Sequence, residues 1–262
     1  MNSPLFEIRG TPSPRTQTIL KISGIAFILL LWQALCMTGW IGPRILPPPM
    51  AVLHTIPDLH FKDALVRQLG YSCFLNGAGY VEAVVVCLPL GFLIGMFPIF
   101  HGMFNGPVNS IRGIPLTAVT GLFMQWFGID NTMKIQFLSF GIIVYLLPVV
   151  VQRTREAPML YQQTAFTLGA TKWQMFRTVF WPYVRSQIVQ DIKVLVVISW
   201  TYIIVAEMMN NTGGVGAILY SSARQGRIDK TFAVLFIIVI VVLVQDWLFQ
   251  VADKIINQHK YI

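Results

Sequence analysis

Residues 232–249 read FAVLFIIVIVVLVQDWLF, and Asp246 is the only one of them with a formal charge. An α-helix needs about 20 apolar residues to cross the hydrocarbon core of a bilayer, and fewer where neighbouring helices shield its ends. A run of this composition has no polar face to turn toward water. It therefore predicts a transmembrane helix.

Similar apolar runs recur along the chain. The 262 residues are 55% hydrophobic and only 11% charged, which is too little charge to cover a soluble globule of this size. We expect an all-α, polytopic membrane protein with six transmembrane helices. The predicted helices cover residues 22–41, 73–99, 114–129, 135–151, 188–209 and 232–249.

The Lys and Arg residues fall mainly in the loops between these runs. When the N-terminus is placed in the cytoplasm, the inner loops carry more Lys and Arg than the outer loops, which favours both termini inside. The formal net charge of +8 is thus explained by membrane orientation and does not indicate nucleic-acid binding. We expect a cytoplasmic N-terminal segment (1–21), one transmembrane domain (22–250) and a cytoplasmic tail (251–262).

No catalytic, metal or cofactor site is predicted. Cys36, Cys73 and Cys87 lie in apolar runs without CxxC or Cys/His spacing, and the four histidines form no cluster. The glycine-rich stretch 213–216 has no Lys-Ser or Lys-Thr after it, so it is no phosphate-binding loop, and no HExxH is present. We expect a protein that is not an enzyme and binds no cofactor of its own.

The loop 152–187 is too long to be a simple connector. Pro158 suits the start of a helix, and Gly169 suits the position just after a helix end, so residues 159–168 are predicted to be helical.

A second helix is predicted to follow directly. Thr171 and Gln174 have the spacing of a capping box, and Pro182 is expected to end the helix before the chain re-enters the membrane. Tyr161 and Ala165 share one side of the first helix with Gly169. The loop could be an interfacial hairpin that merely joins two spans, or a surface on which a partner docks.

The stretch from Gln163 to Gly169, followed by residues 179–182 (Val-Phe-Trp-Pro), resembles the EAA loop of permeases of binding-protein-dependent ABC importers. Ala165, Gly169 and Pro182 match that pattern, whereas Gln163, Thr164 and Trp181 depart from it. The resemblance implies that the loop is a cytoplasmic coupling helix-turn-helix that sits in a groove of an ATPase subunit. The residues it assigns to coupling are Tyr161, Gln163, Thr164, Ala165, Gly169, Lys172, Arg177 and Pro182.

Four further stretches resemble the nitrate, sulfonate, taurine and bicarbonate branch of that family. They are ILPPP at 45–49, RGIP at 112–115 continuing to WFGI at 126–129, AEM at 206–208, and GGVG at 213–216. Their order along almost the whole chain makes the combination specific.

The resemblance also implies a set of partners and a location. It implies two ATP-binding subunits that carry ATP and Mg, a second permease copy, with a homodimer favoured over a heterodimer, and a periplasmic or lipoprotein substrate-binding protein. The chain is then a multi-pass protein of the bacterial inner membrane, in contact with lipid and not with nucleic acid.

Polar side chains inside the spans are candidates for the solute pathway, since charge in a bilayer is costly. Glu82 either lines the path or is a buried, hydrogen-bonded carboxyl. Glu207 is either a gate at the outer end of its span or a hydrated structural group. Hydroxyl groups of Thr120, Ser199 and Tyr202 could offer weak hydrogen bonds to a passing solute.

Two other functions remain open. One is a stand-alone secondary transporter. Such a protein is built from repeated halves, which the sequence does not show, and it would not need a docking hairpin. For an importer, the expected solute is a small oxyanion such as nitrate, bicarbonate or an organic sulfonate, and the alternative is a nitrogenous organic compound.

Overall fold

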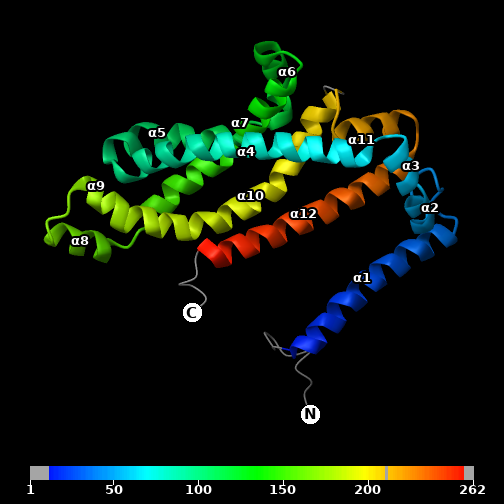
Figure 1. Cartoon of the computed structure of the whole chain (residues 1–262), viewed down its shortest axis with the longest axis horizontal. Coiled ribbons are helices and arrows are strands. Elements are labelled where there is room, and N and C mark those ends of the chain that lie inside the picture. The colour runs from blue at the N-terminus through cyan, green and yellow to red at the C-terminus, as the bar shows by residue number, and fades with distance from the viewer. Residues whose placement is uncertain (1–11, 210–211, 257–262) are drawn as a thin grey trace. The chain divides into compact units, whose positions relative to one another are not determined.

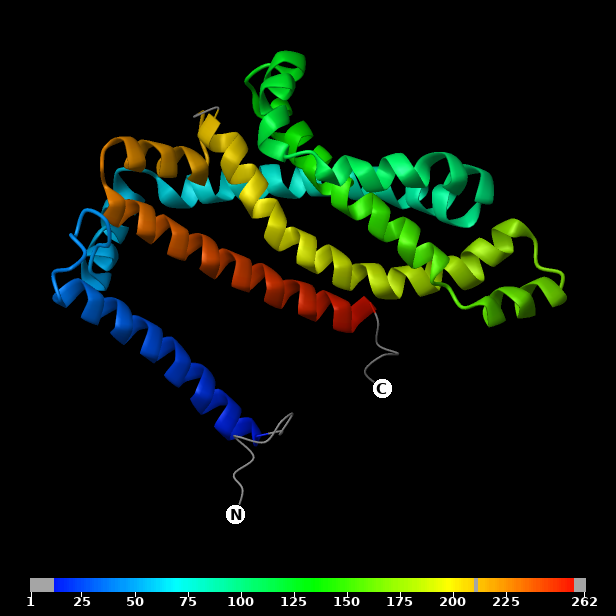
Figure 2. The same cartoon turned by 180° about the vertical axis from the view of Figure 1, so that it is seen from behind.

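The computed structural model describes residues 12–209 and 212–256, and within them every regular element is a helix (Figures 1 and 2). The chain packs as two compact units. One holds residues up to 63 together with 222–233, and the other holds 64–221 and the residues from 234 onward.

Among the described residues, five helices are long and apolar enough to cross a membrane, which confirms the predicted all-α membrane fold. They are Pro14–Met37, Leu65–Met96, Asn131–Arg155, Lys172–Met209 and Ile228–Ile255.

The third predicted span, over 114–129, is shorter than the prediction. Its helix, α6 (Leu116–Phe127), has 12 residues and lies between Pro115 and Gly128, whose φ is +76°. At 1.5 Å per residue it is about 18 Å long, which is less than the roughly 30 Å of a hydrocarbon core. The proline and the left-handed glycine set these limits, and apolar composition alone does not reveal them.

The other long helices begin before the predicted apolar runs, whereas α1 (Pro14–Met37) and α4 (Leu65–Met96) end before the predicted ends at residues 41 and 99. Helix α1 begins well before residue 22, because Ser13 caps it by accepting a hydrogen bond from the Thr16 amide and Pro14 occupies the first turn. Residues 14–21 are thus helical. Helix α4 likewise begins before residue 73, and Pro89 lies within it without ending it.

The first unit contains α1 and two short helices, α2 (Pro49–His54) and α3 (Ile56–Phe61). The Trp32 indole donates a hydrogen bond to the Pro47 carbonyl at 3.1 Å. None of the residues of α1 is buried, and most of its apolar side chains are exposed, as on a helix in contact with lipid.

The second unit is built on α4 and α7 (Asn131–Arg155), which pack along each other. Glycines of α4 make this close approach possible. A Cβ added at Gly91 would lie 2.4 Å from Val150 Cγ1, and one at Gly95 would lie 2.6 Å from Thr154 Cβ. Small residues between membrane helices permit such van der Waals packing.

The remaining helices of this unit surround that pair. Helix α10 packs on α7, and a cluster of Phe123, Met133, Phe137 and Ala206 joins α6, α7 and α10. Figures 1 and 2 show α8 and α9 at one end of the unit and the C-terminal end of α10 at the other. The bounds are α5 (Pro98–Ser110), η1 (Ile111–Gly113), α8 (Met159–Thr167), α9 (Lys172–Met175), η2 (Phe176–Phe180), α10 (Trp181–Met209), α11 (Val215–Arg224) and α12 (Ile228–Ile256).

Candidate functional site

The hairpin of α8 and α9 has the local structure that its sequence predicts. Gly169 follows α8 with φ +75°. The Gly169 amide donates to the Phe166 carbonyl at 2.9 Å, and the Ala170 amide donates to the Ala165 carbonyl at 3.0 Å. This pair of bonds is a Schellman motif, which satisfies carbonyls that the helix leaves unpaired.

The capping box of the second helix is also present. The Gln174 amide donates to the Thr171 hydroxyl, and the Thr171 amide donates to the Gln174 side-chain carbonyl at 2.8 Å. The reversal between the two helices is therefore fixed by backbone chemistry.

The predicted end of the second helix at Pro182 is wrong. The helix runs on from Lys172 to Met209, with a π-helical turn at Phe176–Phe180. In that turn the Trp181 amide donates to the Phe176 carbonyl, five residues back. The wider turn accommodates a proline that lacks an N–H and would otherwise crowd the preceding carbonyls. The hairpin is thus continuous with a transmembrane helix.

The outer surface of the hairpin is apolar and uncovered. Tyr161, Phe166, Leu168 and Trp173 are all more than half exposed. Exposed apolar patches of this kind mark interaction surfaces.

The other predicted coupling residues lie on the hairpin or line the groove beside it. Gln163 is exposed, and its amide has no hydrogen bond to a described residue, whereas the Thr164 hydroxyl donates to the Leu160 carbonyl of its own helix. A groove of about 480 Å³ separates α8 from the π turn and the start of α10. It is lined by Tyr161, Thr164, Ala165, Leu168, Thr178, Val179, Pro182, Tyr183 and Ser186, while Lys172 and Arg177 are exposed nearby on the second helix.

A second cavity lies between α6, α7 and α10. It measures about 340 Å³, and its walls include the rings of Tyr145 and Tyr202, which stack with centroids 6.5 Å apart. Thr117 and Thr201 add hydroxyl groups. Of the predicted pathway residues, Tyr202 lines this cavity.

The other predicted pathway residues pack between helices. The Ser199 hydroxyl is buried and donates toward Asn76 Oδ1 and the Val196 carbonyl, and the buried Thr120 hydroxyl donates to the Thr117 carbonyl. Glu82 accepts a hydrogen bond from the Gln136 amide at 3.0 Å, so it joins α4 to α7. Their part in the pathway stays a prediction.

Glu207 belongs to a buried network at the opposite end of the unit from the hairpin. Its carboxylate, which is fully buried rather than hydrated, accepts from the Ser72 hydroxyl at 2.7 Å and the Gly216 amide at 2.8 Å. The Ser72 hydroxyl in turn accepts from the Val215 amide at 2.9 Å. A Cβ at Gly214, where φ is +95°, would lie 2.1 Å from the Glu207 carboxylate.

Lys134 extends this network. Its side chain is buried, and its ammonium donates to the Thr212 hydroxyl at 2.9 Å and lies 5.1 Å from the centre of the Tyr71 ring. The sequence alone placed Lys134 in an outer loop, and a lysine in the first turn of an apolar helix was the only signal of a buried role. The 212–216 turn is therefore held by groups from α4, α7 and α10.

Ion pairs join the helices toward the hairpin end. Arg153 donates two hydrogen bonds to Asp191, at 2.8 and 3.0 Å, which links α7 to α10. Lys193 pairs with Asp246 at 3.0 Å, so Asp246 is paired within the protein. Asp191 and Lys193, two residues apart on α10, thus have partners on α7 and α12.

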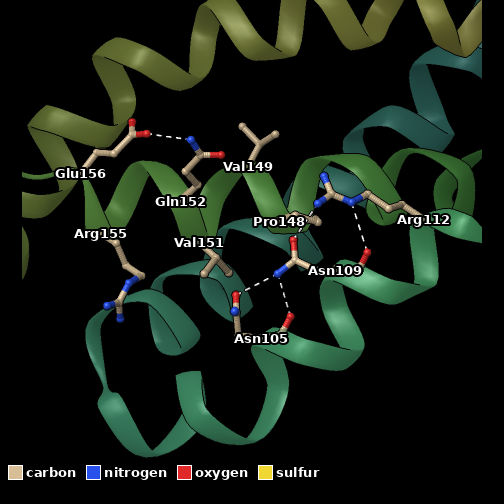
Figure 3. Close-up of a pocket in the computed structure, with 9 residues that line it drawn as sticks. All are labelled: Asn105, Asn109, Arg112, Pro148, Val149, Val151, Gln152, Arg155 and Glu156. Carbon is tan, nitrogen blue, oxygen red and sulfur yellow. Dashed lines mark hydrogen bonds between the residues drawn. The ribbon is translucent and has the colours of Figure 1, made fainter.

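A third cavity, of about 350 Å³, lies between α5 and α7 (Figure 3). Asn105, Asn109 and Arg112 form a hydrogen-bonded row along one wall, and Glu156 and Gln152 are bonded to each other at the other end. The hydrogen bond from Gln152 and the adjacent Arg153 guanidinium lower the pKa of Glu156. Sequence reasoning used Arg112 as part of the RGIP stretch and did not assign it to a site, because nothing local shows that it lines a cavity. Among the described residues no group of His, Cys, Asp and Glu could hold a metal ion.

Solved structures share this architecture. A structure of the MetNI methionine ABC transporter in an inward-facing conformation matches with a TM-score of 0.63 and 19% identity, over 74% of this chain and 95% of that one. An amino acid ABC transporter matches with a TM-score of 0.61 and 15% identity, over 78% and 97%. At these identities the likeness concerns the fold.

Relatives by sequence cover most of the chain. The putative aliphatic sulfonates transport permease protein SsuC of Bacillus subtilis is 25% identical over 82% of this chain and 78% of its own length. The taurine transport system permease protein TauC of Escherichia coli is 25% identical over 86% and 84%. The nitrate import permease protein NrtB of Synechocystis is 26% identical over 85% and 83%.

A family model covers residues 87–258, from within α4 through the hairpin and into the last helix. This match agrees with the apolar helices and with the hairpin after α7, since all three indicate the same kind of membrane protein. The chain belongs to the family of inner membrane components of binding-protein-dependent transport systems, and it is a permease subunit of an ABC importer.

Proposed function

We propose that this chain forms one half of a pathway that carries a small oxyanion into a bacterial cell. A second, identical copy supplies the other half, a substrate-binding protein delivers the solute, and two ATP-binding subunits supply the energy. Both termini lie in the cytoplasm, so the hairpin of α8 and α9 faces the ATPase. The chain binds no cofactor, and ATP and Mg belong to the partner subunits.

The observation that carries this proposal is the exposed apolar face of the hairpin. Phe166, Leu168 and Trp173 have no cover from the described residues, and a rigid reversal at Gly169 presents them. Because the hairpin continues into a transmembrane helix, a force on it reaches the pathway directly. A secondary transporter has no use for such a surface.

The choice of solute rests on the relatives, whose names refer to sulfonates, taurine and nitrate. In the cavity between α6, α7 and α10, Thr117, Thr201 and Tyr202 can offer weak, neutral hydrogen bonds, and Arg112 adds one positive charge to the lining. Selection can then be left to the binding protein, while the path avoids holding the solute tightly.

Uptake into proteoliposomes tests the proposal. The chain is reconstituted with its ATPase and its binding protein, and labelled nitrate, bicarbonate, taurine and an alkanesulfonate are offered on the binding-protein side. We expect uptake that requires ATP on the opposite face. Uptake of a nitrogenous organic compound with no response to any oxyanion would overturn the solute assignment, and uptake without the ATPase would overturn the permease assignment.

Two substitutions at Gly169 test the docking role of the hairpin. A Cβ at this position meets nothing within 4 Å, so only the backbone conformation restricts the residue. Gly169→Val should release the ATPase, because a β-branched residue disfavours φ +75° by more than about 1 kcal/mol. Gly169→Asn is the matched control, since asparagine tolerates that region, and it should keep the ATPase bound. Equal co-purification of both variants with the ATPase would contradict the assignment.

Gln163→Glu tests the departure from the family pattern. The side chain is exposed, and the change keeps its shape and a hydrogen-bond acceptor. We expect transport at the rate of the unmodified protein. Loss of transport would show that the amide itself contacts the ATPase.

A further inference from the structure

Arg112 lines two of the cavities described above. It lies in the 3₁₀ turn η1 between α5 and α6, and it contributes to the cavity between α5 and α7 as well as to the one between α6, α7 and α10. Among the residues that line the second cavity, Arg112 is the only one with a positive charge, and no carboxylate accompanies it. The guanidinium therefore stands where the two spaces meet.

Neighbouring groups hold this side chain in place. Arg112 Nε donates to the Asn109 backbone carbonyl at 3.1 Å, and Nη2 donates to Asn109 Oδ1 at 3.0 Å (Figure 3). The Asn109 amide nitrogen is itself committed to the Asn105 backbone and side-chain oxygens at 2.7 and 3.0 Å. Both bonds from Arg112 go to neutral oxygens, and Nη1 has no hydrogen bond to a described residue. The positive charge is thus positioned without being neutralised.

The carboxylate in the α5–α7 cavity does not cancel that charge. Glu156 lies at the other end of the labelled set in Figure 3 and pairs with Arg153 at 2.9 Å. It also accepts a hydrogen bond from Gln152 at 2.8 Å. Arg155 points away from Arg112 at that same end. An anion that leaves the space beside Tyr202 would meet the Arg112 guanidinium first.

We propose that Arg112 is an anion-binding subsite at the inner mouth of the pathway, which receives the transported oxyanion as it leaves the space beside Tyr202. This inference rests on the proposed function, because the transported solute and the inward direction come from there. A planar guanidinium with free N–H groups suits carboxylate, sulfonate and nitrate oxygens. Asn109 is a positioning residue that directs the guanidinium toward the passage.

Charge substitution in the reconstituted importer tests the proposal. Arg112→Gln should lower the maximal uptake rate of the transported oxyanion about tenfold, equivalent to about 1.4 kcal/mol, because one charged contact in the transit step is lost. Arg112→Lys keeps the charge but not the fork of N–H groups, and it should restore uptake to within a few-fold. Asn109→Leu should give an intermediate rate. Arg15→Gln removes an arginine from the same predicted side of the membrane, at the start of α1, and should leave uptake unchanged.

ATP hydrolysis stimulated by the binding protein is measured in parallel, since a subsite for the solute affects uptake without dissociating the complex. Normal hydrolysis with reduced uptake in Arg112→Gln, together with rescue by Arg112→Lys, would support the subsite. Uptake by Arg112→Gln at the original rate would overturn it. So would equal loss of uptake and hydrolysis in both Arg112 variants, since that would mark a structural role. An unmodified complex that transports no oxyanion would refute the proposed function itself.

Discussion

Removal of the Ser72 hydroxyl should release the turn before α11. This oxygen accepts from the Val215 amide and donates to Glu207, and Ser72 is fully buried. In Ser72→Ala the Val215 N–H is left unpaired, which costs about 1–3 kcal/mol, and the carboxylate loses a hydrogen bond of comparable value. Glu207 keeps its bond from the Gly216 amide, so we expect a net local loss of about 3 kcal/mol.

Amide hydrogen exchange over residues 212–218 measures this effect directly. A loss of about 3 kcal/mol should speed exchange at Val215 and Gly216 roughly 100-fold, while amides in the middle of α7 keep their rates. Ser221→Ala is the matched control, because the Ser221 hydroxyl donates only to the Ile218 carbonyl of its own helix. If Val215 and Gly216 exchange in Ser72→Ala as they do in the unmodified protein, the network does not hold the turn and the reasoning fails.

Two further experiments test the packing of α7 against its neighbours. Gly91→Val should lower the free energy of unfolding in detergent by about 1–3 kcal/mol, because its side chain would overlap Val150, whereas Gly77→Val on the open side of the same helix should cost much less; equal melting temperatures for both variants would contradict the packing. A double-mutant cycle of Arg153→Ala and Asp191→Ala should give a coupling energy of about 1 kcal/mol, because the ion pair is bidentate and partly buried. Strictly additive losses of stability would show that the pair contributes nothing.

Features set by local chemistry could be predicted from the sequence. Gly169 and the pair Thr171–Gln174 act within a few residues of themselves, so their conformations follow from residue type alone. Pro182 misled the prediction, because the helix continues through a π turn before it. Phe176 and Trp181 of that region pack against Phe92 of α4, which is far away in the sequence. For Glu207 the sequence left a gate and a hydrated structural group as alternatives and did not predict its buried network, since two of its partners, Ser72 and Lys134, lie far away in the chain.

The residues that line the cavities were the least predictable part for the same reason. Tyr202 lines a cavity because α6 and α7 happen to enclose it, whereas Ser199, three residues earlier on the same helix, faces α4. The sequence shows which residues are polar, but only the arrangement of helices decides which of them border a space. The place of Arg112 at two cavities was not predicted, because membrane orientation already explains a positive charge in an inner loop.

The unbroken helix from Lys172 to Met209 makes the hairpin a lever. Its 38 residues have a contour length of about 57 Å at 1.5 Å per residue, and the helix bends near the hairpin (Figure 2). A rotation of roughly 10° about its middle displaces each end by at most about 5 Å in opposite directions. A modest push on the hairpin therefore becomes, without any flexible joint, an equal and opposite swing of the far end that carries Glu207.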